Sequence, residues 1–434
     1  MDRTRQSSDP PVVVVGAGAA GTMAAIFAAK AGRRVLLLES TPDGGRKILV
    51  SGGGRCNVLP SDLDPTRYVT DSSPNTLKKI LLSWPLAEQR RFFEQEVGLP
   101  LAREAETGKL FPVSNQARDV RDRLYALARR QGVEFRFQAK VVDLTPPKAS
   151  GQEQGTPWTV HLANQDSLAA SAVVLATGGL SLPGTGSEGT GLHFARRLGH
   201  EIHPTYPALT PLTANPHPHR NLAGLSPIVT LRAPGPNRNA EAQGGFLFTH
   251  RGYSGPTALD LSHLAVRSRL AGGPRQPIYV QWNEMDAGAW EMGLREAQGT
   301  VLGYLRRQLP DRLAEALFVE AGIPADRRPP QLRREERLRL LELLTRYPLL
   351  WTGDEGYAKA EVTGGGVALS EVNPRTLESR RCPGLFLCGE MLDAFGPIGG
   401  YNFVWAWVTG RGVGAGTGRR GQRAERDMTS VVEV

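Results

Sequence analysis

Residues 51–57, SGGGRCN, bring a guanidinium, a thiol and an amide together after three consecutive glycines. Arg55 and Asn57 can donate hydrogen bonds to a ligand, and Cys56 can donate a proton if cationic neighbours lower the pKa of its thiol. Cys56 can also be a small buried core residue, and we favour this second interpretation because free cysteine is among the most buried residue types. A hairpin turn needs at most two glycines. Three in a row therefore raise the question of what needs a backbone without side chains at this point.

A second glycine pattern, GAGAAG at residues 16–21, follows a run of four valines and opens an alanine-rich helix. Gly16 permits a tight turn, Gly18 lets a pyrophosphate approach the backbone, and Gly21 lets helix and strand pack closely. The N-terminus of the helix then faces the phosphates. Glu39 closes the next predicted strand and would accept hydrogen bonds from an adenosine ribose, which disfavours a 2′-phosphate. The stretch predicts a dinucleotide-binding β-α-β unit.

The C-terminal part of the chain indicates which dinucleotide is bound. Gly389 and Glu390 stand at the carboxyl end of a predicted strand, where cofactors bind in such sheets. Further on, glycines precede a helix that is predicted to start near Tyr401 and Asn402. Its free N–H groups would stabilise negative charge on the pyrimidine ring of a reduced flavin, whereas a nicotinamide needs no such support. The pattern favours a flavin; the alternative is a loop-to-helix junction whose glycines serve geometry alone.

Another GxGxxG, at residues 184–189, is the obvious candidate for a separate NAD(P)H site. Pro183 stands directly before it, and the preceding predicted strand already ends at Gly178 and Gly179. We therefore interpret it as the glycine-rich start of the helix that follows.

Composition excludes several classes of protein. No cysteine or histidine spacing matches a metal site, and three cysteines argue against a disulfide framework, so we expect no metal and a cytoplasmic location. No apolar run is long enough to span a membrane. The basic N-terminus imitates a secretory signal, but the glycines of residues 16–21 interrupt the apolar run behind it. The net charge of +9 fits an anionic ligand, a nucleic acid or a basic proteome without choosing among them.

The predicted elements change in character along the chain. Amphipathic helices are predicted at 75–98 and 116–131, antiparallel strands at 132–144 and 158–163, a buried strand at 171–179, short strands among prolines at 205–285, arginine-rich helices at 290–348, strands and glycines from 360, and a last helix from Asn402 to Gly412. Ten arginines and seven acidic residues lie between 301 and 346. We favour the interpretation of this cluster as a solvated charged surface. The alternative is a surface that binds the RNA backbone.

Several motifs together resemble a known family. Besides the glycine fingerprint and its acid, the chain contains GRKILVSGGGRCN, ATGGLSLPGTGSEGTG, FLFTHRGYSGPTALDLS, TGGGVALSEVNPRTLES and GLFLCGEMLDAFGPIGGYN, in that order. Over about residues 11–415 this resembles the BaiN/YhiN-type FAD-dependent oxidoreductases, also called the aminoacetone-oxidase family. The resemblance implies an α/β fold, a doubly wound Rossmann-like FAD-binding domain in two segments with an inserted β-barrel plus helical domain. The expected boundaries are 11–204 and 357–416 for the FAD-binding domain, 205–356 for the insert, and 417–434 for a disordered tail.

The resemblance also implies a set of functional residues. Those expected to bind FAD are Gly16, Gly18, Ala19, Ala20, Gly21, Glu39, Lys47, Ser51, Gly52, Gly53, Arg55, Cys56, Asn57, Val141, Thr177, Gly178, Gly179, Gly389, Glu390, Asp393, Gly399, Gly400, Tyr401 and Asn402. Candidate catalytic residues are His250, Cys56 and Tyr253. His250 is preferred because histidine suits proton transfer near neutral pH. Many relatives carry an aliphatic residue at the position of Tyr253, and the alternative for the whole FTHRGYSGP loop is a glycine-bounded turn in a barrel.

The activity implied by the resemblance is flavin-mediated redox chemistry. Hydride transfer from flavin N5 to an electron-poor carbon, with protonation of its neighbour, would saturate a C=C bond conjugated to a carbonyl. Uridine in large-subunit ribosomal RNA is the preferred substrate because of the net charge and the arginine-rich insert. The alternatives are a small-molecule ene-reductase for a bile-acid-like enone, an aminoacetone oxidase, and a non-catalytic RNA-binding assembly factor. NAD(P)H is expected as a diffusible reductant.

Overall fold

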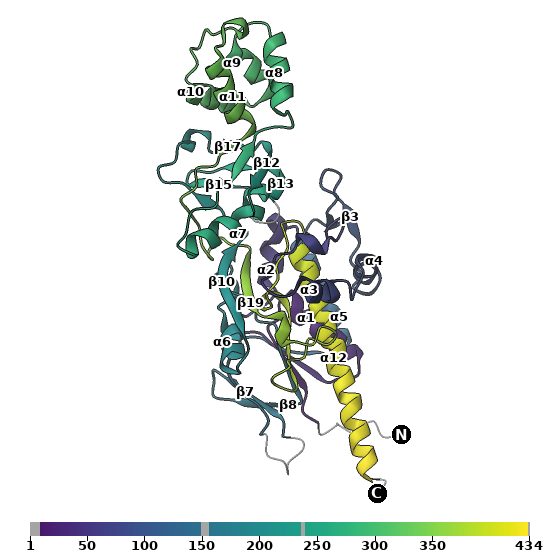
Figure 1. Cartoon of the computed structure of the whole chain (residues 1–434). Coiled ribbons are helices and arrows are strands. Elements are labelled where there is room, and N and C mark those ends of the chain that lie inside the picture. The colour runs from purple at the N-terminus through teal and green to yellow at the C-terminus, as the bar shows by residue number, and fades with distance from the viewer. Residues whose placement is uncertain (1–8, 149–155, 236–238, 433–434) are drawn as a thin grey trace. The chain divides into compact units, whose positions relative to one another are not determined.

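The computed structural model describes residues 9–148, 156–235 and 239–432, with side chains as far as Arg420 (Figure 1). The chain divides into two compact units. Unit 1 is formed by the chain up to Thr205 together with the chain from Val362 onward, and unit 2 is Tyr206–Glu361. The sequence analysis places the corresponding boundaries after residues 204 and 356.

The core of unit 1 is a five-stranded sheet in the order β20-β9-β1-β2-β5, in which every neighbouring pair is parallel. Its strands are β1 (Val12–Val15), β2 (Val35–Leu38), β5 (Glu134–Arg136), β9 (Ala172–Leu175) and β20 (Leu385–Leu387). All residues of β1, β2, β9 and β20 are buried. Continuous runs of valine and leucine are what strands covered on both faces require. The α/β fold class with a parallel sheet is confirmed.

Two helices from opposite ends of the chain pack side by side in unit 1, α1 (Ala19–Lys30) and α12 (Tyr401–Val432) (Figure 1). Gly410, Gly414 and Gly418 repeat every four residues and therefore lie on one face of α12. A Cβ at Gly414 would lie 2.5 Å from the Cβ of Phe27, and one at Gly418 would lie 2.5 Å from the Cβ of Ala31. Close approach of the two backbones thus depends on glycine.

The glycines explain where the prediction for the C-terminus differs from the structure. The sequence predicts that the last helix ends near Gly412 and that residues from 417 form a disordered tail, whereas α12 continues to Val432. Glycine disfavours an isolated helix by about 1 kcal/mol per residue relative to alanine. As far as Gly418, the contact with α1 outweighs that propensity, and sequence propensity alone cannot reveal the contact.

The remaining helices and strands of unit 1 surround this core. They are α2 (Arg46–Val50), α3 (Pro74–Leu81), α4 (Leu86–Arg91), α5 (Ala117–Arg130), α6 (Thr190–Arg197), β3 (Leu101–Arg103), β4 (Leu110–Pro112), β6 (Val141–Thr145), β7 (Trp158–Leu162), β8 (Ser167–Ala170), β10 (Ile202–Ala208) and β19 (Val362–Val367). Strands β6, β7 and β8 form an antiparallel sheet of their own, β10 pairs with β19, and β3 pairs with β4.

Two predictions for this region are wrong in detail. Residues 132–144 do not form one antiparallel strand, because β5 joins the main sheet in parallel with β2 and only β6 pairs with β7. The helix expected at 75–98 is interrupted between Leu81 and Leu86, since a proline at position 85 cannot continue a helix from within.

The described residues of unit 2 form two four-stranded sheets, the helix α7 and a group of four further helices. The sheets have the orders β14-β15-β11-β18 and β13-β12-β16-β17. Their strands are β11 (Leu212–Thr213), β12 (Ile228–Ala233), β13 (Ala240–Gly245), β14 (Leu247–Phe248), β15 (Gly252–Ser254), β16 (Tyr279–Gln281), β17 (Tyr347–Pro348) and β18 (Gly353–Asp354). The helices are α7 (Pro256–Leu270), which packs on β12 and β13, and the group α8 (Ala287–Glu296), α9 (Val301–Gln308), α10 (Asp311–Ala321) and α11 (Arg334–Thr345).

Candidate cofactor-binding site

The glycine fingerprint at residues 16–21 forms the turn between β1 and α1. The N–H of Gly16 donates to the carbonyl of Leu38 at 2.8 Å, and its φ is +106°, a conformation that only glycine adopts without strain. A Cβ at Gly16 would lie 2.5 Å from the carbonyl oxygen of Ala176. A Cβ at Gly21 would collide with the carbonyl oxygen of Gly16. A Cβ at Gly18, by contrast, would meet nothing within 4 Å. Two glycines are therefore required by packing, and the third faces open space in front of the N-terminus of α1.

Glu39 lies at the carboxyl end of β2 and holds this turn in place. Its Oε2 accepts from the N–H of Ala17 at 2.9 Å, and its Oε1 accepts from both the N–H and the hydroxyl of Thr41 at 2.8 Å. Tyr125 of α5 donates to the carbonyl of Ala17 at 2.7 Å. Because each carboxylate oxygen has two lone pairs, Glu39 keeps acceptor capacity for a ribose hydroxyl.

The SGGGRCN segment follows α2, and four of its seven residues have a left-handed backbone conformation. Gly52, Gly53 and Gly54 have φ values of +56°, +67° and +85°, and Cys56 has φ +59°. Cβ atoms at Gly53 and Gly54 would meet nothing within 4 Å. Ser51 closes the end of α2 by donating to the carbonyl of Ile48 at 2.8 Å. The three glycines thus serve both the backbone conformation and an open surface.

The three functional side chains of this segment have different environments. Cys56 is fully buried, and burial raises the pKa of its thiol to about 12, so the thiol stays neutral at physiological pH. The guanidinium of Arg55 lies over the ring of Phe111 at 4.2 Å and pairs with Glu104 at 3.0 Å. Asn57 is buried, and its Oδ1 has no hydrogen-bond partner among the described residues. These environments favour the interpretation of Cys56 as a core residue and leave Asn57 as an acceptor open to a ligand.

A polar cluster surrounds Glu390 at the carboxyl end of β20. Its Oε1 accepts from the hydroxyl of Ser181 at 2.6 Å and from the N–H and hydroxyl of Thr363 at 3.1 and 2.9 Å. Its Oε2 pairs with Lys47, whose ammonium also donates to the hydroxyl of Ser181 at 2.7 Å. Four segments that are far apart in sequence therefore meet at one carboxylate. Ser181 and Thr363 were not predicted, although both lie inside motifs that carry the family resemblance.

Residues 177–179 follow β9 and pack against the same cluster. Gly178 has φ +73°, and a Cβ there would lie 2.7 Å from the hydroxyl of Ser187. A Cβ at Gly179 would collide with the hydroxyl of Thr363. The hydroxyl of Thr177 is buried and has no hydrogen-bond partner among the described residues. Like the amide oxygen of Asn57, it is a polar atom available to a bound molecule.

The N-terminus of α12 forms the other wall of the site. Gly399 and Gly400 precede it with φ values of +120° and +96°, and a Cβ at Gly400 would lie 2.9 Å from the backbone after Leu59 and 3.1 Å from the amide oxygen of Asn57. Tyr68 donates to the carbonyl of Tyr401 at 2.7 Å. The SGGGRCN segment and the start of α12 therefore meet, with the first N–H groups of the helix left unpaired within the helix itself.

Three other predicted residues have mainly structural surroundings. Asn402 exchanges two hydrogen bonds of 2.9 Å with the backbone of Gly396. Val141 is buried at the start of β6. Asp393 is buried, and its Oδ2 accepts four hydrogen bonds from residues 70–72, with the two from Ser72 at 2.8 Å. Contacts of these residues with a cofactor stay predictions.

The residues of unit 1 fit an FAD molecule. The open positions at Gly18, Gly53 and Gly54 form a surface that side chains would fill, next to the positive end of α1. The unpaired oxygens of Asn57 and Thr177 are buried polar atoms that lack protein partners in the part of the chain that the structure describes. Buried polar groups are nearly always satisfied in native proteins. A dinucleotide with many donors and acceptors supplies what these atoms lack.

The remaining catalytic candidates belong to unit 2. His250 is exposed in the turn between β14 and β15, which is closed by the N–H of Thr249 donating to the carbonyl of Gly252 at 2.8 Å. Tyr253 is fully buried, with its hydroxyl 3.1 Å from Nδ1 of His219. The roles of His250 and Tyr253 in catalysis stay predictions, and the described geometry of Tyr253 is that of a core residue.

No group of three or more potential metal-ligating side chains occurs among the described residues. No helix in that part of the chain is both long and apolar enough to cross a membrane.

Several known proteins are similar to this chain over most of its length. The family model described as "HI0933-like protein Rossmann domain" matches residues 10–416. A ribosomal RNA dihydrouridine synthase from Escherichia coli (strain K12) is 33% identical over 384 residues, which is 87% of this chain and 90% of that protein. A 3-dehydro-bile acid delta(4,6)-reductase from Clostridium scindens is 32% identical over 388 residues, 87% of this chain and 91% of that protein. Among solved structures, 3-ketosteroid delta1-dehydrogenase from Sterolibacterium denitrificans, in complex with 1,4-androstadiene-3,17-dione, has a TM-score of 0.51 at 13% identity and covers 95% of this chain and 100% of its own. This last similarity concerns the fold alone.

Proposed function

The chain belongs to the HI0933-like family of FAD-binding Rossmann proteins and is an FAD-dependent oxidoreductase, and on that premise we propose that it reduces uridine to dihydrouridine in large-subunit ribosomal RNA. The choice of ribosomal RNA as the substrate rests on one observation. The chain is 33% identical, over 87% of its length, to a protein named for that activity. The net charge of +9 is compatible with a polyanionic substrate but does not by itself select one. Because ribosomal RNA is the substrate, we propose the cytoplasm as the place of action.

The residues of unit 1 would bind and orient the cofactor. The turn at Gly18 and the N-terminus of α1 would hold the pyrophosphate, and Glu39 would accept from the ribose. Asn57 and the first N–H groups of α12 would face the flavin ring, where donors at a helix N-terminus stabilise negative charge. Bound FAD supplies a hydride at the N5 atom of its flavin.

The reaction also needs a proton for the carbon next to the one that accepts the hydride. The thiol of Cys56 is a poor candidate, because burial raises its pKa to about 12 and excludes it from solvent. His250 is exposed and belongs to a residue type suited to general acid catalysis, so we keep it as the candidate proton donor. His250→Ala would then lower the rate of reduction and leave FAD binding unchanged. Equal rates for the variant and the wild type would remove His250 from the mechanism.

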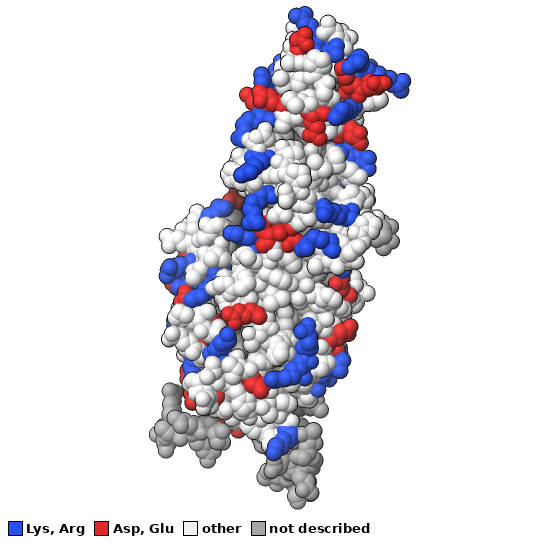
Figure 2. Space-filling model, turned by 90° about the vertical axis from the view of Figure 1, so that its left-hand side faces the viewer, with Lys and Arg blue, Asp and Glu red and all other residues white. Residues whose placement is uncertain are grey.

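The proposal of an RNA substrate does not rest on the arginine-rich helices of unit 2. Between residues 206 and 361 there are 19 lysines and arginines and 16 acidic residues. Arg327 and Arg333 both pair with Glu336, at 3.1 and 2.7 Å, and Arg306 pairs with Glu315. Figure 2 shows one face of the molecule, on which basic and acidic side chains are interspersed. This agrees with a solvated charged surface, the interpretation favoured from the sequence.

The reductant is proposed to be NAD(P)H that diffuses in and out. The second GxGxxG, at residues 184–189, leads into α6, with Gly189 at its N-cap in a left-handed conformation (φ +77°). Its glycines thus serve a turn and a helix start. A separate nicotinamide site is not needed to explain them.

The proposal is tested by mapping dihydrouridine in ribosomal RNA from a strain that lacks this protein. We expect one large-subunit position to lose its dihydrouridine in the deletion strain and to regain it with the wild-type gene. A gene carrying Gly18→Glu, which places a carboxylate where the pyrophosphate would approach, should not restore it. An unchanged level of dihydrouridine in the ribosomal RNA of the deletion strain would refute the proposed function.

A second candidate function is the reduction of a conjugated small-molecule ketone. It is favoured by the 32% identity to the bile-acid reductase and involves the same saturation of a C=C bond conjugated to a carbonyl. Rapid turnover of an enone by the purified protein, with ribosomal RNA left unmodified, would establish it instead. Oxidation of aminoacetone with release of ammonia would indicate the amine-oxidase alternative. A flavin that NAD(P)H does not reduce would indicate a non-catalytic binding role.

A further inference from the structure

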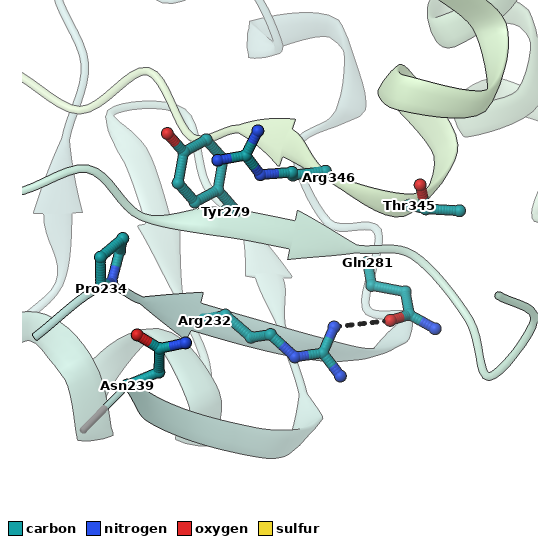
Figure 3. A pocket seen from close by; sticks show the side chains of 7 residues that line it. All are labelled: Arg232, Pro234, Asn239, Tyr279, Gln281, Thr345 and Arg346. Carbon is teal, nitrogen blue, oxygen red and sulfur yellow. Dashed lines mark hydrogen bonds between the residues drawn. The ribbon is translucent and has the colours of Figure 1, made fainter. Parts of the chain in front are cut away.

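A basic and aromatic hollow lies on the outer face of the sheet β13-β12-β16-β17 in unit 2 (Figure 3). Its volume is about 290 Å³. It is lined by Arg232, Pro234, Asn239, Tyr279, Gln281, Thr345 and Arg346. These residues lie outside the cofactor site and take no part in the proposed chemistry.

The strand periodicity explains why these side chains share one face. Leu231 of β12 is directly opposite Val280 of β16, and both are buried in the core of unit 2. Their neighbours Arg232 and Tyr279 are also directly opposite each other and must point the other way, because successive residues of a strand face opposite sides. The hollow is therefore built on regular strands, which hold its side chains more precisely than a loop would.

Arg346 and Tyr279 form the central feature of the hollow. The guanidinium of Arg346 lies 4.3 Å from the centre of the Tyr279 ring, and Figure 3 shows it above the ring. Arg346 is exposed, and its side chain has no carboxylate or hydrogen-bond partner among the described residues. Many other arginines of unit 2 do have one, for example Arg295 with Glu291 at 2.8 Å. An arginine stacked on an aromatic ring, with its hydrogen-bond donors unused, is prepared for an anionic or planar ligand.

The floor of the hollow is fixed and polar. Arg232 donates to the side-chain oxygen of Gln281 at 2.7 Å and pairs with Glu241 at 2.7 Å. Gln281 in turn donates to the carbonyl of Met285 at 3.2 Å. The amide of Asn239 lies at the rim, near Arg232 (Figure 3). Amide and guanidinium groups are the side chains that read the edges of nucleobases.

We propose that this hollow binds one nucleotide of a single-stranded RNA segment. The base would stack on the open side of the Arg346 guanidinium, which Tyr279 supports from behind. Arg346 would also supply positive charge to the phosphates, whereas the charge of Arg232 is offset by Glu241. Unstacked bases commonly pack on aromatic rings and guanidinium planes, and single strands are bound by this combination of stacking and charge. The volume admits a single splayed-out nucleotide and not a double helix. The proposal rests on RNA being the substrate and adds the place at which unit 2 holds it.

The test is the affinity of the full-length, FAD-loaded protein for a short fluorescent oligouridylate, measured by anisotropy at several salt concentrations. We expect Tyr279→Ala to weaken binding about tenfold, the loss typical of one stacked base. Arg346→Ala should weaken it similarly and lower the dependence of log K on log salt by about one, since one phosphate contact is lost. Arg295→Ala is the matched control. It removes the same charge from an exposed helix of the same unit and should leave affinity unchanged.

The possible outcomes distinguish a failure of this proposed RNA site from a failure of the proposed reductase function. Wild-type affinity in both Tyr279→Ala and Arg346→Ala would overturn the site, whether or not the protein reduces uridine. Competition by inorganic tripolyphosphate as strong as that by oligouridylate would also overturn it, because a simple anion site needs no stacking. If the variants lose RNA affinity but no uridine is reduced by the wild type, the site stands and the reductase assignment fails. Because both substitutions lie in unit 2 and the flavin is bound by unit 1, folding of the variants is checked by far-UV circular dichroism and by wild-type-like thermal unfolding of unit 2.

Discussion

The packing of α12 against α1 provides the sharpest prediction of stability. Gly410 faces the first half of α1, where an added Cβ would collide with the carbonyl oxygen of Ala20 and lie 2.8 Å from the Cβ of Met23. Gly412 is two residues away on another side of α12, and its added Cβ would make ordinary contacts with Leu377 at 3.5 Å and beyond. Both replacements by alanine gain about 1 kcal/mol of helix propensity. Only Gly410→Ala also pushes the helices apart, at a cost of about 1–3 kcal/mol.

We therefore expect Gly412→Ala to be about 1 kcal/mol more stable than the wild type and Gly410→Ala to be about 1–3 kcal/mol less stable than Gly412→Ala. The free energies of unfolding can be measured by urea titration, with release of flavin fluorescence as the signal for unit 1. Gly410→Ala should also bind FAD more weakly, because Ala20 belongs to the first turn of α1 and α12 begins in the same site. Equal stability of the two variants would refute the argument that glycine sets the distance between these helices.

Three further predictions concern single polar groups. Asn57→Leu should weaken FAD binding about tenfold, as measured by flavin titration of the apoprotein, and leave the stability of the apoprotein unchanged, because the amide oxygen has no protein partner among the described residues. Asp393→Asn should lower the free energy of unfolding by about 2–3 kcal/mol, since one carboxylate oxygen accepts four hydrogen bonds; a urea midpoint like that of the wild type would contradict this. Burial lowers the pKa of His219 to about 4, below its value near 6.5 in the unfolded chain. The unfolded chain therefore takes up the proton first, and unit 2 should lose about 3 kcal/mol as the pH falls from 6.5 to 4. In His219→Gln this loss should be absent when urea titrations are repeated across that range.

The sequence predicts those parts of the fold that are determined by residues close together in the chain. The conformation of Gly16 and the close contact of Gly21 are fixed by the turn in which they lie, so the spacing alone identifies them. The valine and leucine runs of β1 and β2 identify buried parallel strands for a similar reason. The open glycines of the SGGGRCN segment were likewise expected from the missing side chains.

The parts that sequence does not predict depend on distant partners. The sequence predicts that Glu390 faces a cofactor, but it does not reveal the contacts of Glu390 with Lys47, Ser181 and Thr363, which lie 343, 209 and 27 positions away. The glycines of α12 look like helix breakers until α1 is placed beside them. Tyr253 is a catalytic candidate from the sequence, whereas the structure encloses it in the aromatic core of unit 2. In each case the outcome depends on tertiary contacts, which local sequence preferences do not reveal.

The central claim is that this protein transfers a hydride to a uridine of ribosomal RNA, and a single-turnover experiment tests it most directly. The purified protein is reduced without oxygen, freed of excess reductant, and mixed with large-subunit RNA from a strain that lacks the gene. The account predicts that the flavin is reoxidised and that one uridine gains two hydrogens for each flavin oxidised, as measured by mass spectrometry of RNA fragments. A flavin that stays reduced in the presence of this RNA but is reoxidised by a conjugated ketone would contradict it.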